Sequence, residues 1–280
     1  MVLGLNFAGR DLLYAVSAGG KVTTLHHIGR IVLNVDATQA LGRPGSEDLR
    51  VVSAAVRDLV VKHGIKRIRL IVPAELETWA TVPKLVYDHP DEREAYLSIL
   101  HHGVDRAELA PTWHELSNRD YKLLGVRAKS TLAGYREIGD LAPEYDLCSE
   151  FEAGLEWISA QSNPGSVLLI GCHESVLTVS SFTLGSLRAA TWFRFEDPSD
   201  LRYLWPHTAA SAKWMSGVHE RILLYGANAW QNADLLHAFH ESSIPFLRLD
   251  SLSLIGVAAE EQTYGFGLDE AFPAIMMAIN

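Results

Sequence analysis

The first third of the chain predicts three strands, a helix and a further strand. Three segments rich in Val, Leu, Ile and Thr, at residues 2–7, 12–17 and 21–33, are separated by short turns at residues 9–11 and 19–20. Ser46 can cap a helix in which apolar residues recur at helical spacing until Gly64. The continuous apolar run at residues 68–72 is typical of a strand that is covered on both faces. The order is therefore βββαβ.

An excursion follows before this order resumes. Residues 78–82 can extend as another strand, and the pattern from residue 90 to residue 102 is helical. Residues 111–116 and 121–128 predict the arms of a hairpin that turns at residues 117–120. Residues 131–138 then read as a helix. We expect a helix-hairpin insert near residues 90–130.

The second half of the chain repeats the order of the first. Ser149 and Glu152 have the spacing of a capping box that opens a helix. Strands are expected at residues 167–170, 176–182, 187–195 and 221–225, with helices at 200–215, interrupted at Pro206, and at 232–240. The order βββαβα therefore occurs twice. We predict an α/β protein of two related lobes with a mixed sheet in each, at residues 1–147 and 148–280.

Composition limits the classes of function. The 280 residues, 48% of them hydrophobic, are enough to bury two cores. With 34 acidic and 24 basic side chains the formal charge is -10, which disfavours nucleic acid as a partner. Cys148 and Cys172 are the two cysteines, far apart and outside any metal-ligand spacing. No segment has the roughly 20 apolar residues of a membrane span, so we expect a cytoplasmic protein, with peripheral membrane recruitment left open.

The repeated βββαβα order resembles the actin-like (RNase H-like) superfamily, which includes actin, Hsp70, sugar kinases, FtsA and PilM. Residues 68–74, Ile-Arg-Leu-Ile-Val-Pro-Ala, are similar to the strand ending in Val-Pro-Ala of Hsp70-like members. Residues 78–83 resemble the extended strand ending in Pro of PilM-like members, and residues 221–229 resemble the adenosine motif of the superfamily. The resemblance covers nearly the whole chain, and the motifs follow one another in the expected order.

The resemblance also shows which chemical groups have been replaced. In this superfamily a hairpin turn from each lobe faces the phosphates and normally begins Asp-x-Gly, since Asp holds Mg²⁺ and glycine lets backbone N–H groups approach phosphate. Here the first turn begins at Asn6 and ends at Gly9. Aligned through residues 174–175, the acidic position of the second turn falls on Ile170 and the glycine position on Cys172. Neither Asn6 nor Ile170 carries the charge that holds a metal.

The resemblance therefore implies a vestigial nucleotide cleft. Its candidate residues are Asn6, Gly9, Cys172, His173, Gly226 and Asn228. An ordinary structural role is the simpler explanation for several of them, because a strand-ending Asn can stabilise the turn at Gly9 through its side chain. Binding of ATP and Mg²⁺ is possible but not supported. Glu75 and Glu77, two positions apart, could face one side of an extended segment as a base.

Three hypotheses of function follow. The first is a non-catalytic scaffold or assembly protein, because PilM-like proteins, as the resemblance implies, form a cytoplasmic platform that recruits short peptides and assembles with copies of itself. The partner is then a protein or a second copy, with the tryptophans as candidate anchors, Trp205 and Trp230 before the others. The alternative is an ATP-binding enzyme or kinase with atypical phosphate contacts. An α/β-hydrolase-like enzyme ranks last, because no GxSxG elbow is present.

Overall fold

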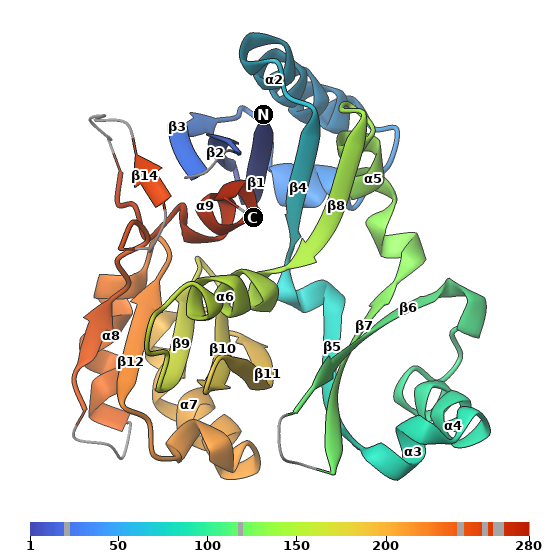
Figure 1. The fold of residues 1–280 in the computed structure, drawn as a ribbon, viewed down its shortest axis with the longest axis vertical. Coiled ribbons are helices and arrows are strands. Elements are labelled where there is room, and N and C mark those ends of the chain that lie inside the picture. Colours follow the sequence, from blue (N-terminus) through green and yellow to red (C-terminus); the bar gives the residue numbers. More distant parts are fainter. Residues whose placement is uncertain (20–22, 117–119, 240–243, 254–256, 260–265, 280) are drawn as a thin grey trace.

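The computed structural model describes residues 1–19, 23–116, 120–239, 244–253, 257–259 and 266–279. Its framework is three sheets (Figure 1). The first has the order β14-β3-β2-β1-β4-β8, with bounds Val257–Ala259, Thr23–Val32, Asp11–Ala18, Val2–Ala8, Arg67–Val72 and Glu144–Ser149. β1, β2 and β3 are antiparallel, whereas β4 and β8 run parallel to β1. Parts of the turns expected at 19–20 and 117–120 lie outside the described residues.

The second sheet repeats this arrangement. It has the order β11-β10-β9-β12-β13, with bounds Ser186–Arg194, Val176–Thr183, Ser166–Cys172, Arg221–Tyr225 and Phe246–Arg248. β9, β10 and β11 are antiparallel, and β12 and β13 run parallel to β9. Each large sheet thus combines an antiparallel meander with parallel strands. The duplicated lobes with mixed sheets that the sequence predicts are confirmed.

The insert has a sheet of its own. β5 (Glu77–Pro83), β7 (Tyr121–Ala128) and β6 (Leu109–Glu115) form it in that order, all antiparallel. Helices α3 (Lys84–Asp88) and α4 (Pro90–Leu100) lie in the same part of the chain (Figure 1). Leu97 of α4 packs with apolar residues of the three strands to form a small core. The strand near residue 80 therefore belongs to the insert sheet and to neither large sheet.

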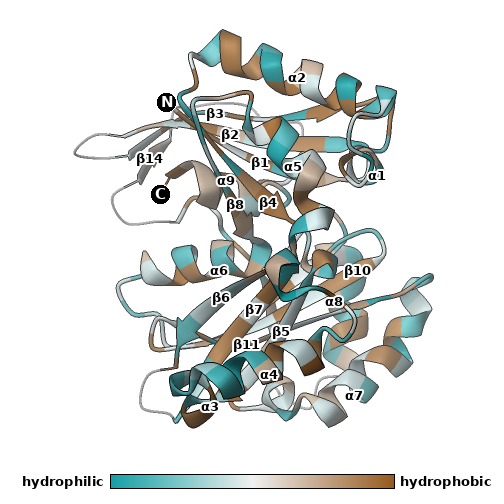
Figure 2. Cartoon of the chain, turned by 90° about the vertical axis from the view of Figure 1, so that its right-hand side faces the viewer, coloured by the Kyte–Doolittle hydropathy of each residue, from teal (hydrophilic) through white to brown (hydrophobic). Residues whose placement is uncertain are grey.

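Helices cover the two large sheets. They are α1 (Ala37–Leu41), α2 (Glu47–His63), α5 (Ala133–Gly139), α6 (Glu150–Ser159), α7 (Leu201–Ser211), α8 (Ala229–Phe239) and α9 (Phe272–Ile279). Figure 2 shows α2 with hydrophobic and hydrophilic residues alternating around it, as expected for a surface helix with one buried face. Its bounds follow from its caps, because the N–H of Leu49 donates to Ser46 Oγ at 3.1 Å and Gly64 adopts the left-handed conformation with a φ of 59°.

Helix α7 differs from the prediction at Pro206. The sequence predicts an interruption there, yet α7 is continuous and contains the proline. A proline removes its own N–H from the helix, but burial of the neighbouring side chains can compensate. Trp205 is 1% exposed and packs in the core of the second lobe. Tertiary packing therefore holds the helix through the proline, and the candidate anchor Trp205 is a core residue.

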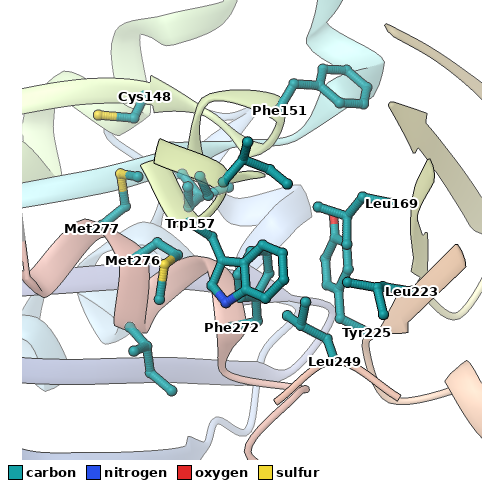
Figure 3. Packing of buried hydrophobic residues seen from close by; sticks show 14 of the residues in the cluster. Cys148, Phe151, Trp157, Leu169, Leu223, Tyr225, Leu249, Phe272, Met276 and Met277 are labelled. Carbon is teal, nitrogen blue, oxygen red and sulfur yellow. The ribbon is translucent and has the colours of Figure 1, made fainter. Parts of the chain in front are cut away.

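Helix α9 ties the end of the chain to its beginning. It packs against β1, β2 and β4 and also contacts α6. Phe272, Met276 and Met277 lie in the apolar cluster between the lobes, beside Trp157 of α6 (Figure 3). A Cβ atom at Gly4 would lie 2.7 Å from the backbone N of Ala278, so the missing side chain lets the helix reach the strand. The division at residues 147 and 148 stays a prediction, although β14 belongs to the first sheet and α9 packs against that sheet.

Candidate functional site

A cleft of about 550 Å³ lies where the turns of the two meanders meet. Five of the six candidate residues line it: Asn6, Gly9, His173, Gly226 and Asn228. Cys172 does not, because its side chain is buried in the core of the second lobe. Its backbone oxygen still contributes by accepting a hydrogen bond from the N–H of Asn228 at 3.2 Å. The structure thus brings together residues that are more than 200 positions apart in the sequence.

The first-lobe turn is fixed by helix α1. Gly9 has a φ of 57°, a conformation that side chains rarely adopt, and its N–H donates to Thr38 Oγ1 at 3.2 Å. The N–H of Ala37 donates to the Gly9 oxygen at 2.7 Å. Asn6 is 7% exposed, lines the cleft, and its side chain has no hydrogen-bond partner among the described residues. The side-chain bond expected from Asn6 to this turn is therefore not formed, and its amide is directed to the cleft instead.

The second-lobe turn has no side chain at the position equivalent to Asn6. The first turn closes at the pair Ala8 and Asp11, and the second closes where the N–H of His173 donates to the Val176 oxygen. Counting back the same number of residues from each turn sets Asn6 opposite Gly171. The alignment made from the sequence placed the acidic position at Ile170, one residue before the position that the structure gives, Gly171. The two turns have no residues in common from which the sequence could fix their alignment.

Glu150 of α6 fills the space beside Gly171. A Cβ atom at Gly171 would lie 2.6 Å from the Tyr225 hydroxyl and 2.7 Å from Glu150 Oε1. The Glu150 side chain is 5% exposed; its Oε1 accepts hydrogen bonds from Thr178 Oγ1 at 3.0 Å and from the Tyr225 hydroxyl, and lies 2.7 Å from His173 Nε2. Tyr225 thus points into the protein. No sequence motif identifies Glu150 as a functional residue. The sequence shows only that it follows the helix-capping residue Ser149.

Glu150 and His173 form a charged pair. Burial acts to raise the pKa of Glu150, but the positive His173 and the three hydrogen bonds hold it below its ordinary value. Burial acts to lower the pKa of His173, but the Glu150 carboxylate raises it above its ordinary value. Oε1 of Glu150 thus has three partners, all of them from the second lobe. No group of three or more metal-ligating side chains occurs among the described residues.

Acidic side chains predominate around the cleft. Six carboxylates line it, those of Asp11, Asp36, Glu75, Glu150, Glu174 and Glu270, beside two basic side chains, His173 and Arg194. Both basic side chains are paired, because Arg194 contacts Glu75 as His173 contacts Glu150. Arg30 pairs with Asp11 and lies 3.7 Å from Glu270. Within the described part of the chain, no basic side chain pairs with Asp36 or Glu174.

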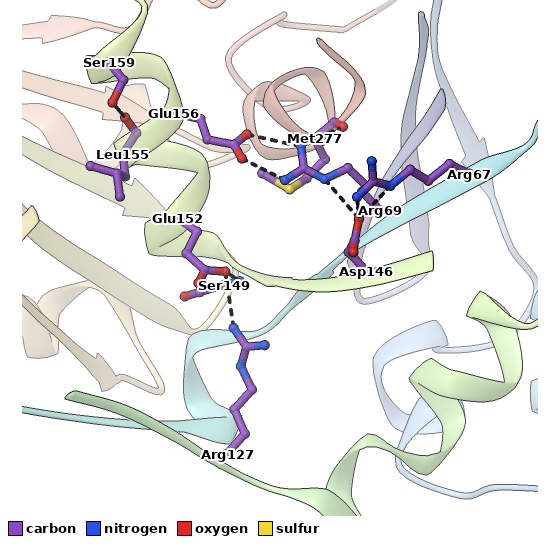
Figure 4. A network of polar contacts seen from close by, with 10 residues as sticks. All are labelled: Arg67, Arg69, Arg127, Asp146, Ser149, Glu152, Leu155, Glu156, Ser159 and Met277. Atoms are coloured by element: carbon purple, nitrogen blue, oxygen red, sulfur yellow. Dashed lines mark hydrogen bonds and ion pairs between the residues drawn. The ribbon is translucent and has the colours of Figure 1, made fainter. Parts of the chain in front are cut away.

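Glu77 lies away from the cleft, at the junction of the insert with both lobes. Its carboxylate contacts Arg127 Nε and Ser149 Oγ and accepts from Trp79 Nε1 at 3.0 Å. Arg127 also lies 3.5 Å from Glu152 in the first turn of α6 (Figure 4). Burial raises the pKa of Glu77, and Arg127 and the hydrogen bonds oppose this shift. Glu77 therefore joins the insert to α6, and the base that we considered at Glu75 and Glu77 is not assembled.

Two lobes whose meander turns face one cleft define the actin-like ATPase fold. The chain is similar to a chain of the PilM-PilN type IV pilus biogenesis complex, with a TM-score of 0.74 and 11% identity, covering 100% of this chain and 98% of that chain. No protein-family model and no curated protein sequence matches the chain. None of the described helices is both long enough and apolar enough to cross a bilayer.

Two further solved structures support the same fold. One is a Bacteroides thetaiotaomicron protein with an actin-like ATPase fold and unknown function, with a TM-score of 0.53 and 12% identity, covering 89% of this chain and 90% of that chain. The other is the cytoplasmic domain of EpsL, an inner membrane component of the type II secretion system of Vibrio cholerae. Its TM-score is 0.51 at 12% identity, covering 98% of this chain and 93% of that chain.

Proposed function

We propose that this chain is a non-catalytic assembly protein, which uses the actin-like fold as a cytoplasmic platform to hold a protein partner or a second copy of itself. The observation that carries the proposal is the cleft between the lobes, where carboxylates outnumber basic groups and each basic group is already paired. The likeness to a chain of the PilM-PilN complex supports an assembly role, because it covers 100% of this chain and 98% of that chain.

The cleft residues do not fit a nucleoside triphosphate. Phosphate groups are held by unpaired N–H groups and basic side chains, or through Mg²⁺ bound by carboxylates. Asn6 has no charge, Gly171 has no side chain, and Oε1 of Glu150 already has three partners. Asp36 and Glu174 add negative charge without a basic partner among the described residues. An anionic ligand would therefore meet repulsion, and we derive no chemical step through ATP.

The alternative is an ATP-binding enzyme or kinase with atypical phosphate contacts. The observation in its favour is Asn6, whose amide lines the cleft without a partner in the described chain and could orient a metal-bound water. The two functions differ in what Mg-ATP does to the folded state, because a ligand that binds only the folded protein stabilises it.

Thermal unfolding with and without Mg-ATP separates the two functions. A ligand at a hundred times its Kd stabilises by about 2.7 kcal/mol, and each kcal/mol raises Tm by roughly 2–4 °C in a chain of this size. We expect no change in Tm with millimolar Mg-ATP beyond that caused by MgCl₂ and sodium tripolyphosphate. A rise of several degrees that is specific to the nucleotide would contradict the proposal and support the enzyme.

A further inference from the structure

We propose that the cleft between the lobes binds a basic segment of the protein partner, with an arginine or lysine side chain between Asp36 and Glu174. The inference rests on the proposed function, because it names the chemistry of the partner and the place where it is held. Among the described residues, three features of the cleft carry it: two carboxylates without a basic partner, a cleft-lining amide without a hydrogen-bond partner, and a volume of about 550 Å³.

The two carboxylates come from opposite lobes. Asp36 precedes α1, where one of its oxygens caps the helix by accepting from the N–H of Gln39 at 2.9 Å. Glu174 is exposed in the turn between β9 and β10. A Cβ atom placed on Gly9 would lie 3.6 Å from Glu174 Oε2, so this carboxylate reaches across to the first-lobe turn. A single positive group entering here would contact negative charge from both lobes.

Asn6 supplies an independent indication of a ligand. An amide that lines a cleft without a protein partner is available to hydrogen-bond a ligand or water. Asn6 is 7% exposed, and no described residue hydrogen-bonds its side chain, although Thr38 and Gly9 lie in the same wall of the cleft. The amide oxygen can accept from the N–H groups of a guanidinium or an ammonium group, and the amide NH₂ can donate to a backbone carbonyl of the same segment.

A side chain of a partner fits these groups better than a free metal ion. No cluster of three ligating side chains exists among the described residues, so a bare cation would lack a coordination shell. A guanidinium carries five N–H donors in a plane and can bond two carboxylates and an amide oxygen together. The backbone of its segment can lie along the small residues Ala8, Gly9 and Ala227 of the cleft wall. Two lobes held by one partner would also be fixed relative to each other.

A fluorescent peptide tests this directly. The probe is the pentapeptide Gly-Arg-Gly-Arg-Gly, measured by fluorescence anisotropy at low and at physiological salt. Its control carries citrulline, the neutral isostere, at both arginine positions. We expect the arginine peptide to bind the full-length protein at least about tenfold more tightly than the citrulline peptide, because charge-assisted hydrogen bonds are roughly twice as strong as neutral ones.

Matched variants separate the cleft from the general acidity of the chain. Asp36→Asn with Glu174→Gln removes two charges from the cleft, and Asn is as good a helix cap as Asp, so α1 keeps its cap. Asp58→Asn with Glu137→Gln removes two charges from exposed positions on α2 and α5. We expect the first pair to weaken binding of the arginine peptide about tenfold and the second to leave it within about twofold. Asn6→Leu, similar in size but apolar, should also weaken binding.

Any outcome other than these would contradict the inference. Equal weakening by both double variants would show general charge attraction, and absence of binding in every protein would show no site. Spermidine competing as strongly as the peptide would show a site for a free polyamine instead of a partner segment. Stabilisation by Mg-ATP would overturn the proposed function itself, whereas failure of the peptide with Mg-ATP still without effect would overturn only the site. A Tm for each variant within a few degrees of the wild type confirms folding.

Discussion

Some residues of the cleft can be predicted from the sequence, and others cannot. Asn6, Gly9, Gly226 and Asn228 stand where a known motif order places them, so a resemblance is enough to find them. Glu150 cannot be found in this way, because it enters the cleft from the start of a helix and its partners His173 and Tyr225 are 23 and 75 positions away. The packing of α6 on the second sheet brings these groups together.

Gly171 should tolerate no side chain. A Cβ atom there would lie 2.6 Å from the Tyr225 hydroxyl and 2.7 Å from Glu150 Oε1, in a site that is already filled. We expect Gly171→Ala to lower the free energy of unfolding by about 1–3 kcal/mol, the range for overpacked cores. Urea unfolding measures this. Gly19→Ala is the matched control, since no atom lies within 4 Å of its added Cβ atom; an equal loss in both variants would show that the packing is wrong.

The Glu150 and His173 pair predicts a pH dependence of stability. The raised pKa of His173 contributes stability that is complete below its ordinary value of 6.5 and is lost as pH rises through the raised pKa. The lowered pKa of Glu150 contributes stability above its ordinary value of 4.5, which is lost as pH falls through the lowered pKa. The stabilising effect of the pair should therefore be greatest between these two ordinary values.

Comparison with His173→Gln isolates this effect. Removing one partner leaves Glu150 buried without its positive partner, which costs about 3 kcal/mol or more where the pair is fully ionised. The difference in Tm between wild type and His173→Gln should be largest between pH 4.5 and pH 6.5 and should narrow in alkaline solution. A constant difference over the whole range would contradict a charged pair.

At the scale of elements, caps and apolar spacing predict most helices and strands. The capping box of α6 is present as predicted, with the N–H of Ser149 donating to Glu152 Oε2 at 2.6 Å. The prediction fails where long-range packing decides the outcome. Pro206 lies inside α7, and β5 pairs with β7 in the insert sheet, although neither follows from local spacing. Strand partners that are 38 to 50 residues apart, as in β5 and β7, leave no trace in a periodic pattern.

The attachment of the insert makes a prediction of its own. Arg127 and Arg106 each pair with a glutamate, but the first pair is buried and the second lies at the surface. Arg127→Gln leaves Glu77 buried without its basic partner and should cost about 3–5 kcal/mol in the free energy of unfolding. Arg106→Gln should cost about 1 kcal/mol or less. Urea unfolding of both variants compares them, and similar losses would show that Arg127 does not hold the insert.

At the scale of the whole molecule, the repeat of βββαβα in the sequence is sufficient to predict two lobes. It does not predict where the last helix goes, because α9 is apolar on all sides and could cover several surfaces. Two features determine the position of α9. Gly4 has no side chain, so the helix can approach β1 closely, and Phe272 of the helix packs in the apolar cluster between the lobes. The cleft thus lies between lobes that share a continuous core as well as ion pairs.

The central claim is that this cleft serves a basic partner segment and no nucleotide. A crystal structure grown with the arginine pentapeptide and Mg-ATP together tests it most directly, because both ligands then compete for the same volume. The account predicts an arginine guanidinium between Asp36 and Glu174, with its N–H groups donating to both carboxylates and to the Asn6 amide oxygen. Nucleotide phosphates beside Asn6 and Gly9, with the peptide absent from the cleft, would contradict it.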